Sequence, residues 1–564
     1  MTSVGSSTSN TSSAGDTSRR LDVLEAVREL FADDDLDSIL ALIAKLLATH
    51  REQLRDILQA TKRRSSGKSE GVSAAQLDWL LKQLQKAAEQ QAGEVHPTQS
   101  AADAALLSTA KPEPPVGQKV DHPRPPPPRR RPIPAGLPVV DNVIAVPDEQ
   151  RPCPICGKER TCIGHETTRV IDIEPARVIV RADRREKLGC EEHGEIVTAP
   201  LGDKVVEGGA YGSRLVSELI VAKYDEGMPL ERQHERLLRL GLDMPTASMG
   251  DQVTWATELL TPIAREIIEE VLASDTMHLD GTSVPVLDKK APNGIKIGAL
   301  WAYAGVNIRV IDDKAIEDRR AAYIYMRRNT KNGDKAHGEF GAEEMLERRR
   351  QKNKPNVCCD ADGRFDASFD RPGLTEIGCN MHARRYFKKA LDAGDVRAAL
   401  PIAAFKRLYD VEQRAKGMTP DERLAMRQAE SRPVYRELLA WCLTYHRTEL
   451  PGSLLFAAVR YLTNHSDALM RFLDDGALPI DNGLVERLHR TPIIGVRNWL
   501  FCGSDAGGER AAIAFTVLGT CKLLGINPAA YLADVLPQLA RGIVPARDLP
   551  RLMPAAWARA HPPP

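Results

Sequence analysis

Long apolar runs are absent from this sequence, and none reaches the roughly 18 residues that a membrane-spanning helix needs. The first twenty residues also lack the apolar block of a signal peptide. Cysteine is scarce, with ten among 564 residues, which is too few for a disulfide scaffold. We therefore expect a soluble protein of a reducing compartment that is not exported and does not contact membranes.

Net charge is absent too, because 77 Lys and Arg residues balance 77 Asp and Glu residues. Without a global field, any contact with a polyanion must come from local basic patches. The hydrophobic share of 42% and the charged share of 27% are ordinary for globular proteins, which excludes wholesale disorder. A chain of this length predicts a multidomain protein.

The N-terminal region predicts a tail followed by a helical segment. Residues 1–20 are rich in Ser, Thr and Gly and predict a disordered tail. Residues 21–95 predict a coiled coil that dimerises the chain, because apolar residues recur at alternating four- and three-residue steps. These residues are Leu36, Leu40, Ile43, Leu47, Leu54 and Ile57. The alternative is an amphipathic helix packed inside a globular domain.

Residues 96–150 predict a Pro- and Arg-rich linker. Four prolines, Pro125 to Pro128, precede Arg129, Arg130 and Arg131. Consecutive prolines favour an extended chain without backbone donors. The three arginines either clamp phosphates or form a solvated basic tether.

Residues 151–205 predict a zinc-binding segment. Two pairs of ligand residues, each with two residues between its members, place four donors within reach of one tetrahedral Zn²⁺. The four are Cys153, Cys156, Cys190 and His193. Such a closed set leaves no open position, so the ion would be structural. Cys162 and His165 are rival ligands, and without metal the short segment would lack a sufficient core.

Residues 206–272 predict a helical region. One helix begins at Pro229 and ends at Gly241, and Thr246 or Ser248 can cap another. Two short helices around a Gly-containing turn resemble a DNA-binding helix-turn-helix, although connections in any helical bundle have the same pattern.

The pattern changes to β-strands after Asp275. Four short apolar segments are separated by Lys, Asn and Gly turns, and a charged stretch precedes the fourth segment. This order predicts a mixed α/β sheet. The segments are MHLDGTSVPVL, IGALWAYAG, IRVID and NVCCDAD. Helices are predicted from Met381 to about Leu539, and residues 541–564 form a Pro/Arg tail.

Two acidic positions belong to these strands. Asp280 ends the segment MHLD, where a carboxylate among apolar residues is costly unless it pairs with a cation or a metal. Asp362 follows the strand at 356–359. Asp360 would lie on the same face of an extended chain, so the spacing leaves both residues open as candidates.

A third acid, Glu486, is predicted in the second turn of a helix that Asp481 or Asn482 can cap. Acids from two strands and a helix can hold two Mg²⁺ ions about 4 Å apart for phosphoryl transfer. Many other triples exist among 77 acidic residues, so the pattern alone does not decide the site.

Seven blocks of sequence resemble the insertion-sequence-66 family of bacterial transposases. They are CPICG (153–157), LIVAKYDEGMPLERQ (219–233), HLDGTSVPVL (278–287), GCNMHARRYF (378–387), IDNGLVERLHR (480–490), RNWLFCGSDAGGERAA (497–512) and GINPAAYLADVL (525–536). The resemblance implies a ribonuclease-H-like domain of the DDE class with Asp280, Asp362 and Glu486 as its acids. Asp362 is preferred to Asp360 because it begins an Asp-Gly-aromatic pattern that fits the family's block.

The resemblance also implies the domain organisation and the chemistry. The catalytic domain would span residues 273–510, with a helical insertion at about 390–475, and C-terminal helices would occupy 511–540. The implied cofactors are two Mg²⁺ or Mn²⁺ ions at the acids and one structural Zn²⁺. The implied partners are element-end and target DNA, a second copy of the chain and accessory proteins of the same element, in the bacterial cytoplasm.

The chain departs from the family at two places. Gly281 stands where the family usually has an acid, and Asn482-Gly483 stands where it usually has Asn-Asn. Neither change removes an expected metal ligand. Arginines in the same blocks are expected either to hold DNA phosphates or to pair with neighbouring acids. They are Arg384, Arg385, Arg487, Arg490 and Arg497.

We therefore predict a DNA transposase that binds the ends of an insertion sequence and catalyses metal-dependent strand cleavage and strand transfer. The alternative is a catalytically inactive DNA-binding or scaffold protein derived from such an enzyme. Acids at all three positions favour activity.

Overall fold

The computed structural model describes residues 177–181, 187–189, 196–198, 205, 210–291, 293–327, 342–361, 363–541 and 547–562. The predicted coiled coil, the linker with its arginines and the whole zinc site lie outside these residues. Asp362 lies outside them as well. Between 177 and 205, strands β1 (Lys187–Gly189) and β2 (Ile196–Thr198) pair antiparallel. No helix of the described ranges combines the length and apolarity that crossing a membrane requires.

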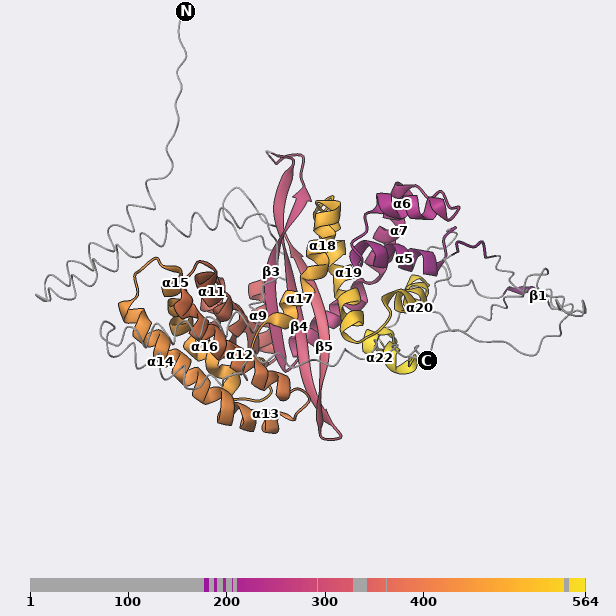
Figure 1. Ribbon diagram of the computed structural model, residues 1–564. Helices are drawn as coiled ribbons and strands as arrows, with labels where there is room; N and C mark the ends of the chain where they lie inside the picture. The colour runs from indigo at the N-terminus through magenta and orange to yellow at the C-terminus, as the bar shows by residue number, and fades with distance from the viewer. Residues whose placement is uncertain are drawn as a thin grey trace, which may run out of the picture.

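A five-stranded mixed sheet with the strand order β5-β4-β3-β6-β7 forms the centre of the molecule (Figure 1). The first three strands are an antiparallel meander, and the last two run parallel to β3. The strands are β3 (Thr276–Leu287), β4 (Ile295–Ile311), β5 (Lys314–Met326), β6 (Asn356–Cys359) and β7 (Thr375–Gly378). The predicted mixed α/β sheet with flanking helices is confirmed.

Two strand predictions were wrong in detail. IGALWAYAG and IRVID are one strand, β4, because Val306 and Asn307 between them pair with Arg319 and Asp318 of β5 in an unbroken ladder. Strand β5 was missed, because its first half is charged and exposed and gives no apolar signal. Its second half is apolar and buried.

Helices cover both sides of the sheet. Those before it are α5 (Ser213–Tyr224), α6 (Leu230–Arg239), α7 (Thr246–Leu259) and α8 (Thr261–Ala273). Helix α6 thus ends before Gly241, whose φ of +87° suits a residue that follows a helix. Helix α7 begins at Thr246 without a side-chain cap, contrary to the predicted cap.

The helices between and after the strands form two groups. In Figure 1, α11 to α16 gather on one side of the strands, and α19, α20 and α22 lie with α5 to α7 on the other. The bounds are α9 (Ala342–Gln351), α10 (Asp366–Phe369), α11 (Asn380–Asp392), α12 (Ala399–Arg414), α13 (Pro420–Met426), α14 (Arg432–Thr448), α15 (Leu454–Asn464), α16 (Ser466–Met470), α17 (Gly483–Leu488), α18 (Arg490–Trp499), α19 (Asp505–Leu523), α20 (Pro528–Ala540), α21 (Leu549–Leu552) and α22 (Pro554–Ala560).

Each group has its own buried core. One cluster joins the sheet to α5, α7, α8, α19 and α20, and a second joins the helices from α11 to α16 to β6 and β7. The second cluster centres on large, fully buried side chains such as Trp441, Phe387 and Phe405. Hydrophobic burial in these two cores stabilises both the sheet and the helical insertion.

Arg349 of α9 holds the starts of β3 and β6 together. Its side chain is fully buried and donates hydrogen bonds to five carbonyls, among them that of Val271 at 3.5 Å. Leu272, Ser274 and Asp275 accept at 3.1 Å, and Asn356 accepts at 2.8 Å. Because a buried guanidinium needs its donors satisfied, this contact ties the end of α8 to the two strands that carry the acidic residues.

Candidate active site

Asp280 lies on strand β3, and Asp360 directly follows the neighbouring parallel strand β6. The β3–β6 ladder ends with His278 opposite Cys358; Asp280 and Asp360 each follow two residues later, and their charges interact. Residues two apart in a strand share a face, so both carboxylates lie on one face of the sheet. The structure thus brings Asp360 to Asp280.

The pKa of the Asp280 carboxyl group is raised above its ordinary value. Burial, and after it the charges of Asp360 and Glu486, raise its pKa from 3.8 to about 7. The backbone N–H of Gly281, which donates to Oδ1 at 2.8 Å, and the charge of Arg385 oppose the shift. Three carboxylates therefore interact at this place, with an excess of negative charge that a cation would neutralise.

Helix α17 presents Glu486 to the two aspartates. The helix begins at Gly483, so Glu486 lies in its first turn and not in the second as predicted. Asn482 makes no side-chain cap. Asp481 instead accepts from the backbone N–H of Gly483 at 2.8 Å and from the hydroxyl of Tyr409 at 2.7 Å. The predicted capping therefore occurs through Asp481 alone.

Asn482 joins the elements that carry the site. It is fully buried, and its amide donates to the carbonyl of Leu279 at 2.8 Å. Its Oδ1 lies 3.1 Å from Nδ1 of His278, whose pKa burial lowers to about 4, so the neutral imidazole donates to it. The backbone N–H of Asn482 donates to Sγ of Cys379 at 3.2 Å. The start of α17 is thereby fixed against β3 and the end of β7.

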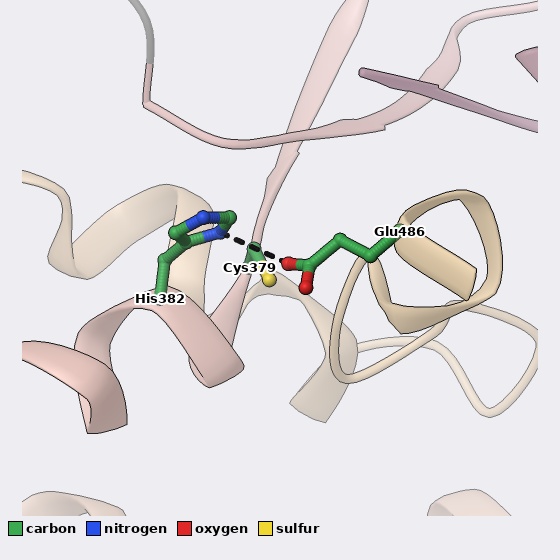
Figure 2. Close-up of side chains that lie close together, drawn as sticks. All are labelled: Cys379, His382 and Glu486. Carbon is green, nitrogen blue, oxygen red and sulfur yellow. Dashed lines mark ion pairs between the residues drawn. The ribbon is translucent and has the colours of Figure 1, made fainter. Parts of the chain in front are cut away.

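A Cys-His-Glu cluster lies beside the aspartates. Donor atoms of Cys379, His382 and Glu486 lie within 4.8 Å of one another (Figure 2). Nδ1 of His382 is 3.5 Å from Oε1 of Glu486, and Arg385 donates to Oε2 of Glu486 at 3.1 Å. Arg385 also lies 3.1 Å from Nε2 of His382. Both oxygens of Glu486 are therefore faced by side chains of α11.

The tautomer of His382 follows from these contacts. Arginine can only donate, so Nε2 of His382 accepts from Arg385 and Nδ1 carries the proton that faces Glu486. Burial raises the pKa of the Cys379 thiol to about 12, which keeps it protonated. The cluster is thus better suited to orient Glu486 than to bind a metal by itself.

His489 lies on the other side of the site. Its side chain is buried, and Nε2 is 3.6 Å from Oδ2 of Asp280. Neither ring nitrogen makes a hydrogen bond. Burial lowers the pKa of this imidazole, an effect that the backbone of Asp280 opposes. A neutral, unpartnered imidazole therefore faces the carboxylate cluster.

Gly281 explains one departure from the family's pattern. A Cβ at this position would lie 2.9 Å from the ring of Trp301 on the neighbouring strand. The indole also packs edge-on against Phe365, just after β6. An acidic side chain at this position would therefore require Trp301 to move.

One of the predicted arginines forms an ion pair, and three others are exposed. Arg385 pairs with Glu486, as the ion-pair alternative expects. Arg487, Arg490 and Arg497 are exposed on α17 and α18, and no ion pair joins them to the described residues. On α18, the exposed Ile493 and Ile494 lie between these arginines.

Asp280 and Glu486 were predicted as site acids on the family resemblance, and Asp360 was the alternative to Asp362. Asp280 and Glu486 lie in one electrostatic cluster, which Asp360 completes. His382 and His489 were missed. Two spacings could have found them, Cys-x-x-His at 379–382 and Glu-x-x-His at 486–489, because both place two donors on one helix face or turn.

The family model described as Transposase IS66 family matches residues 208–510, which is more than half of the chain. The chain belongs to the IS66 family of transposases. A second model, the IS66 C-terminal element, matches residues 516–555. Five of the seven resembling blocks fall within these ranges, the block at 497–512 extends two residues beyond the first, and CPICG precedes both.

Three proteins of Sinorhizobium fredii (strain NBRC 101917 / NGR234) are similar to this chain. The uncharacterized protein y4hP is 29% identical over 450 residues, which are 77% of this chain and 78% of the relative. The uncharacterized protein y4qI is 28% identical over 442 residues, with the same shares. The uncharacterized protein y4jD is 27% identical, covering 75% of this chain and 81% of its own. No solved structure matches the chain.

Proposed function

We propose that this IS66-family chain is a DNA transposase that cleaves and joins DNA strands with a divalent-metal centre of Asp280, Asp360 and Glu486. The observation that carries the proposal is the register of β3 and β6, which brings the charges of Asp280 and Asp360 together, with Glu486 in electrostatic contact. Asp362 remains the rival for the second acid. The order of three antiparallel and two parallel strands supports a ribonuclease-H-like catalytic domain.

The residues present fit divalent ions. Carboxylate oxygens are the preferred ligands of Mg²⁺ and Mn²⁺. Burial is the main cause of the raised pKa of Asp280, and the charges of Asp360 and Glu486 add to it against the opposing charge of Arg385. When bound, two ions supply activation of the attacking oxygen and neutralisation of the leaving oxygen.

The protein's own side chains orient the centre. Arg385 and His382 face the two oxygens of Glu486 and restrict its rotation, while each oxygen keeps a lone pair for an ion. The Gly281 N–H fixes one oxygen of Asp280. The other oxygen, Oδ2, is thereby directed into the site. Positioning of this kind is what in-line displacement at a phosphate requires.

The DNA contacts of the proposal lie on exposed arginines. Arg487, Arg490 and Arg497 follow Glu486 along α17 and α18, so a strand held by them would run past the acids. End and target DNA in the bacterial cytoplasm are the proposed substrates. The coiled coil of residues 21–95 would pair two copies, as joining two ends requires.

The proposal is tested with the purified chain, DNA carrying the element's ends, and Mg²⁺ or Mn²⁺. We expect nicks at the ends that disappear with EDTA. Glu486→Gln should still bind the DNA in a gel-shift assay but should not cut it. End DNA that is bound and never cut by the unaltered chain would instead indicate the inactive, DNA-binding derivative.

A zinc site in residues 151–205 is the proposal's prediction for the N-terminal region. If Cys153, Cys156, Cys190 and His193 form one closed site, metal analysis should find about one Zn²⁺ per chain. Cys156→Ser should lose that zinc while the catalytic domain stays folded by circular dichroism. Carefully reduced protein that contains no zinc would reject the site.

A further inference from the structure

The imidazole ring of His489 is buried and has no hydrogen-bond partner. His489 is 4% exposed, and both of its ring nitrogens lack a hydrogen bond. Buried polar groups are almost always paired, because leaving one unpaired destabilises the folded protein. The group that faces His489 is a carboxylate, with Nε2 3.6 Å from Oδ2 of Asp280.

The backbone around His489 fixes where the ring lies. The hydroxyl of Tyr323 on β5 donates to the carbonyl of Leu488 at 2.8 Å. The N–H of His489 donates to Val485 at 3.3 Å, and its carbonyl accepts from Ile493 at 3.0 Å. The junction of α17 and α18 is therefore anchored on both sides, so the ring is held over Asp280.

His489 directly follows α17, three residues after Glu486. Glu486 and His489 form a Glu-x-x-His pattern, in which residues three apart share a helix face. Helices in carboxylate-bridged metal proteins use this pattern to direct one oxygen and one nitrogen at a metal centre. The second histidine of the site, His382, differs, because its Nε2 already accepts from Arg385.

We propose that His489 binds, through Nε2, the divalent ion that Asp280 holds. This inference rests on the proposed function, since it adds a nitrogen ligand to the same centre. Two ligands at right angles on an ion with bonds of about 2.1 Å lie about 3 Å apart. The observed 3.6 Å between Nε2 and Oδ2 is close to that separation.

The consequence is a preference among metals. An imidazole ligand favours transition ions, whereas Mg²⁺ favours oxygen. The ratio of Mn²⁺ affinity to Mg²⁺ affinity should therefore be higher at this centre than at a site made of carboxylates alone. His489→Gln should weaken Mn²⁺ binding roughly tenfold and change Mg²⁺ binding less than about threefold.

The test is pulsed electron paramagnetic resonance of Mn²⁺ bound to the full chain. Directly bound imidazole nitrogen modulates the Mn²⁺ spin echo. We expect ¹⁴N modulation in the unaltered chain, its loss in His489→Gln and its retention in His382→Gln, the matched control. Labelling the unaltered chain with ¹⁵N-histidine should replace the ¹⁴N signal, which keeps the test valid if a variant fails to fold.

The outcomes separate the two proposals. Mn²⁺ bound without a histidine nitrogen signal, or a signal that survives in His489→Gln, overturns the assignment of His489 alone. Loss of the signal in His382→Gln overturns it as well. If the unaltered chain binds no Mn²⁺, or Asp280→Asn binds it equally well, the proposed metal centre itself fails, and the assignment of His489 fails with it.

Discussion

Asp280 shows how single residues are tuned for the site. Its pKa of about 7 has two causes of the same sign, burial and the charges of Asp360 and Glu486. Arg385 opposes them without cancelling them. A carboxylate that resists ionisation in the absence of a cation, and becomes ionised when one binds, couples metal binding to proton release.

A stability measurement follows from the same shift. The unfolded chain ionises Asp280 near 3.8 and the folded chain near 7, so the folded state binds the extra proton between these values. Stability contributed by this group is therefore lost as the pH rises from about 4 to about 7. Asp280→Asn should stabilise the metal-free protein at pH 8 by roughly 2–4 kcal/mol, and by nothing near pH 4.

Thermal unfolding in EDTA at both pH values checks this prediction. The exposed Asp366→Asn is the control and should change the free energy of unfolding by less than about 0.5 kcal/mol. A melting temperature that drops in Asp280→Asn at pH 8 would show that Asp280 is not crowded by like charges.

At the scale of elements, β-strand register adds information that periodicity along the sequence does not contain. Asp360 and Asp362 lie on the same face of an extended chain, so periodicity left both open. The pairing of His278 with Cys358 brings the charge of Asp360 to that of Asp280, and no local pattern encodes that pairing. Long-range register of this kind depends on contacts such as those of the buried Arg349.

The other helices and strands differ in how well their positions could be predicted from the sequence. Strand β3 and the long helices were predictable, because their apolar residues are periodic. Strand β5 was not, since residues such as Glu317 and Arg319 lie on its exposed half. His489 was missed because its Glu-x-x-His spacing shows only its relation to Glu486, whereas its nearness to Asp280 depends on the neighbouring strand.

The junction of α17 with β3 gives a prediction for Asn482. Asn482→Ala leaves the carbonyl of Leu279 and the ring of His278 without partners in a buried place, which should cost about 1–3 kcal/mol. Cleavage should fall as well, because the start of the Glu486 helix loses its anchor. Denaturant unfolding measures the cost, with the exposed Asn464→Ala as control. Equal stability of the two variants would contradict this role.

At the scale of the whole molecule, a chain of zero net charge must bind DNA locally. The exposed arginines of α17 and α18 are the proposed patch. Replacing Arg487, Arg490 and Arg497 by Gln should lower the slope of log affinity against log salt by about one for each phosphate that the chain no longer binds. Fluorescence anisotropy with end DNA at several salt concentrations measures the slope.

A control set of arginines lies on the helical insertion. Arg436, Arg447 and Arg460 are exposed on α14 and α15, away from α18 (Figure 1). Their replacement by Gln removes the same charge from the chain and should leave the slope nearly unchanged. Equal effects of the two triple variants would mean that total charge, and not the patch beside the acids, governs binding.

The central claim is that register-aligned Asp280 and Asp360, with Glu486, form the centre that cuts DNA. Single-turnover cleavage of end DNA in Mn²⁺ by Asp360→Asn and Asp362→Asn tests it most directly, with DNA binding measured alongside. We predict that Asp360→Asn lowers the cleavage rate by at least about 10³-fold with binding retained, and that Asp362→Asn stays within about fivefold of the unaltered chain. The reverse pattern, or normal cleavage by both variants, would contradict the claim.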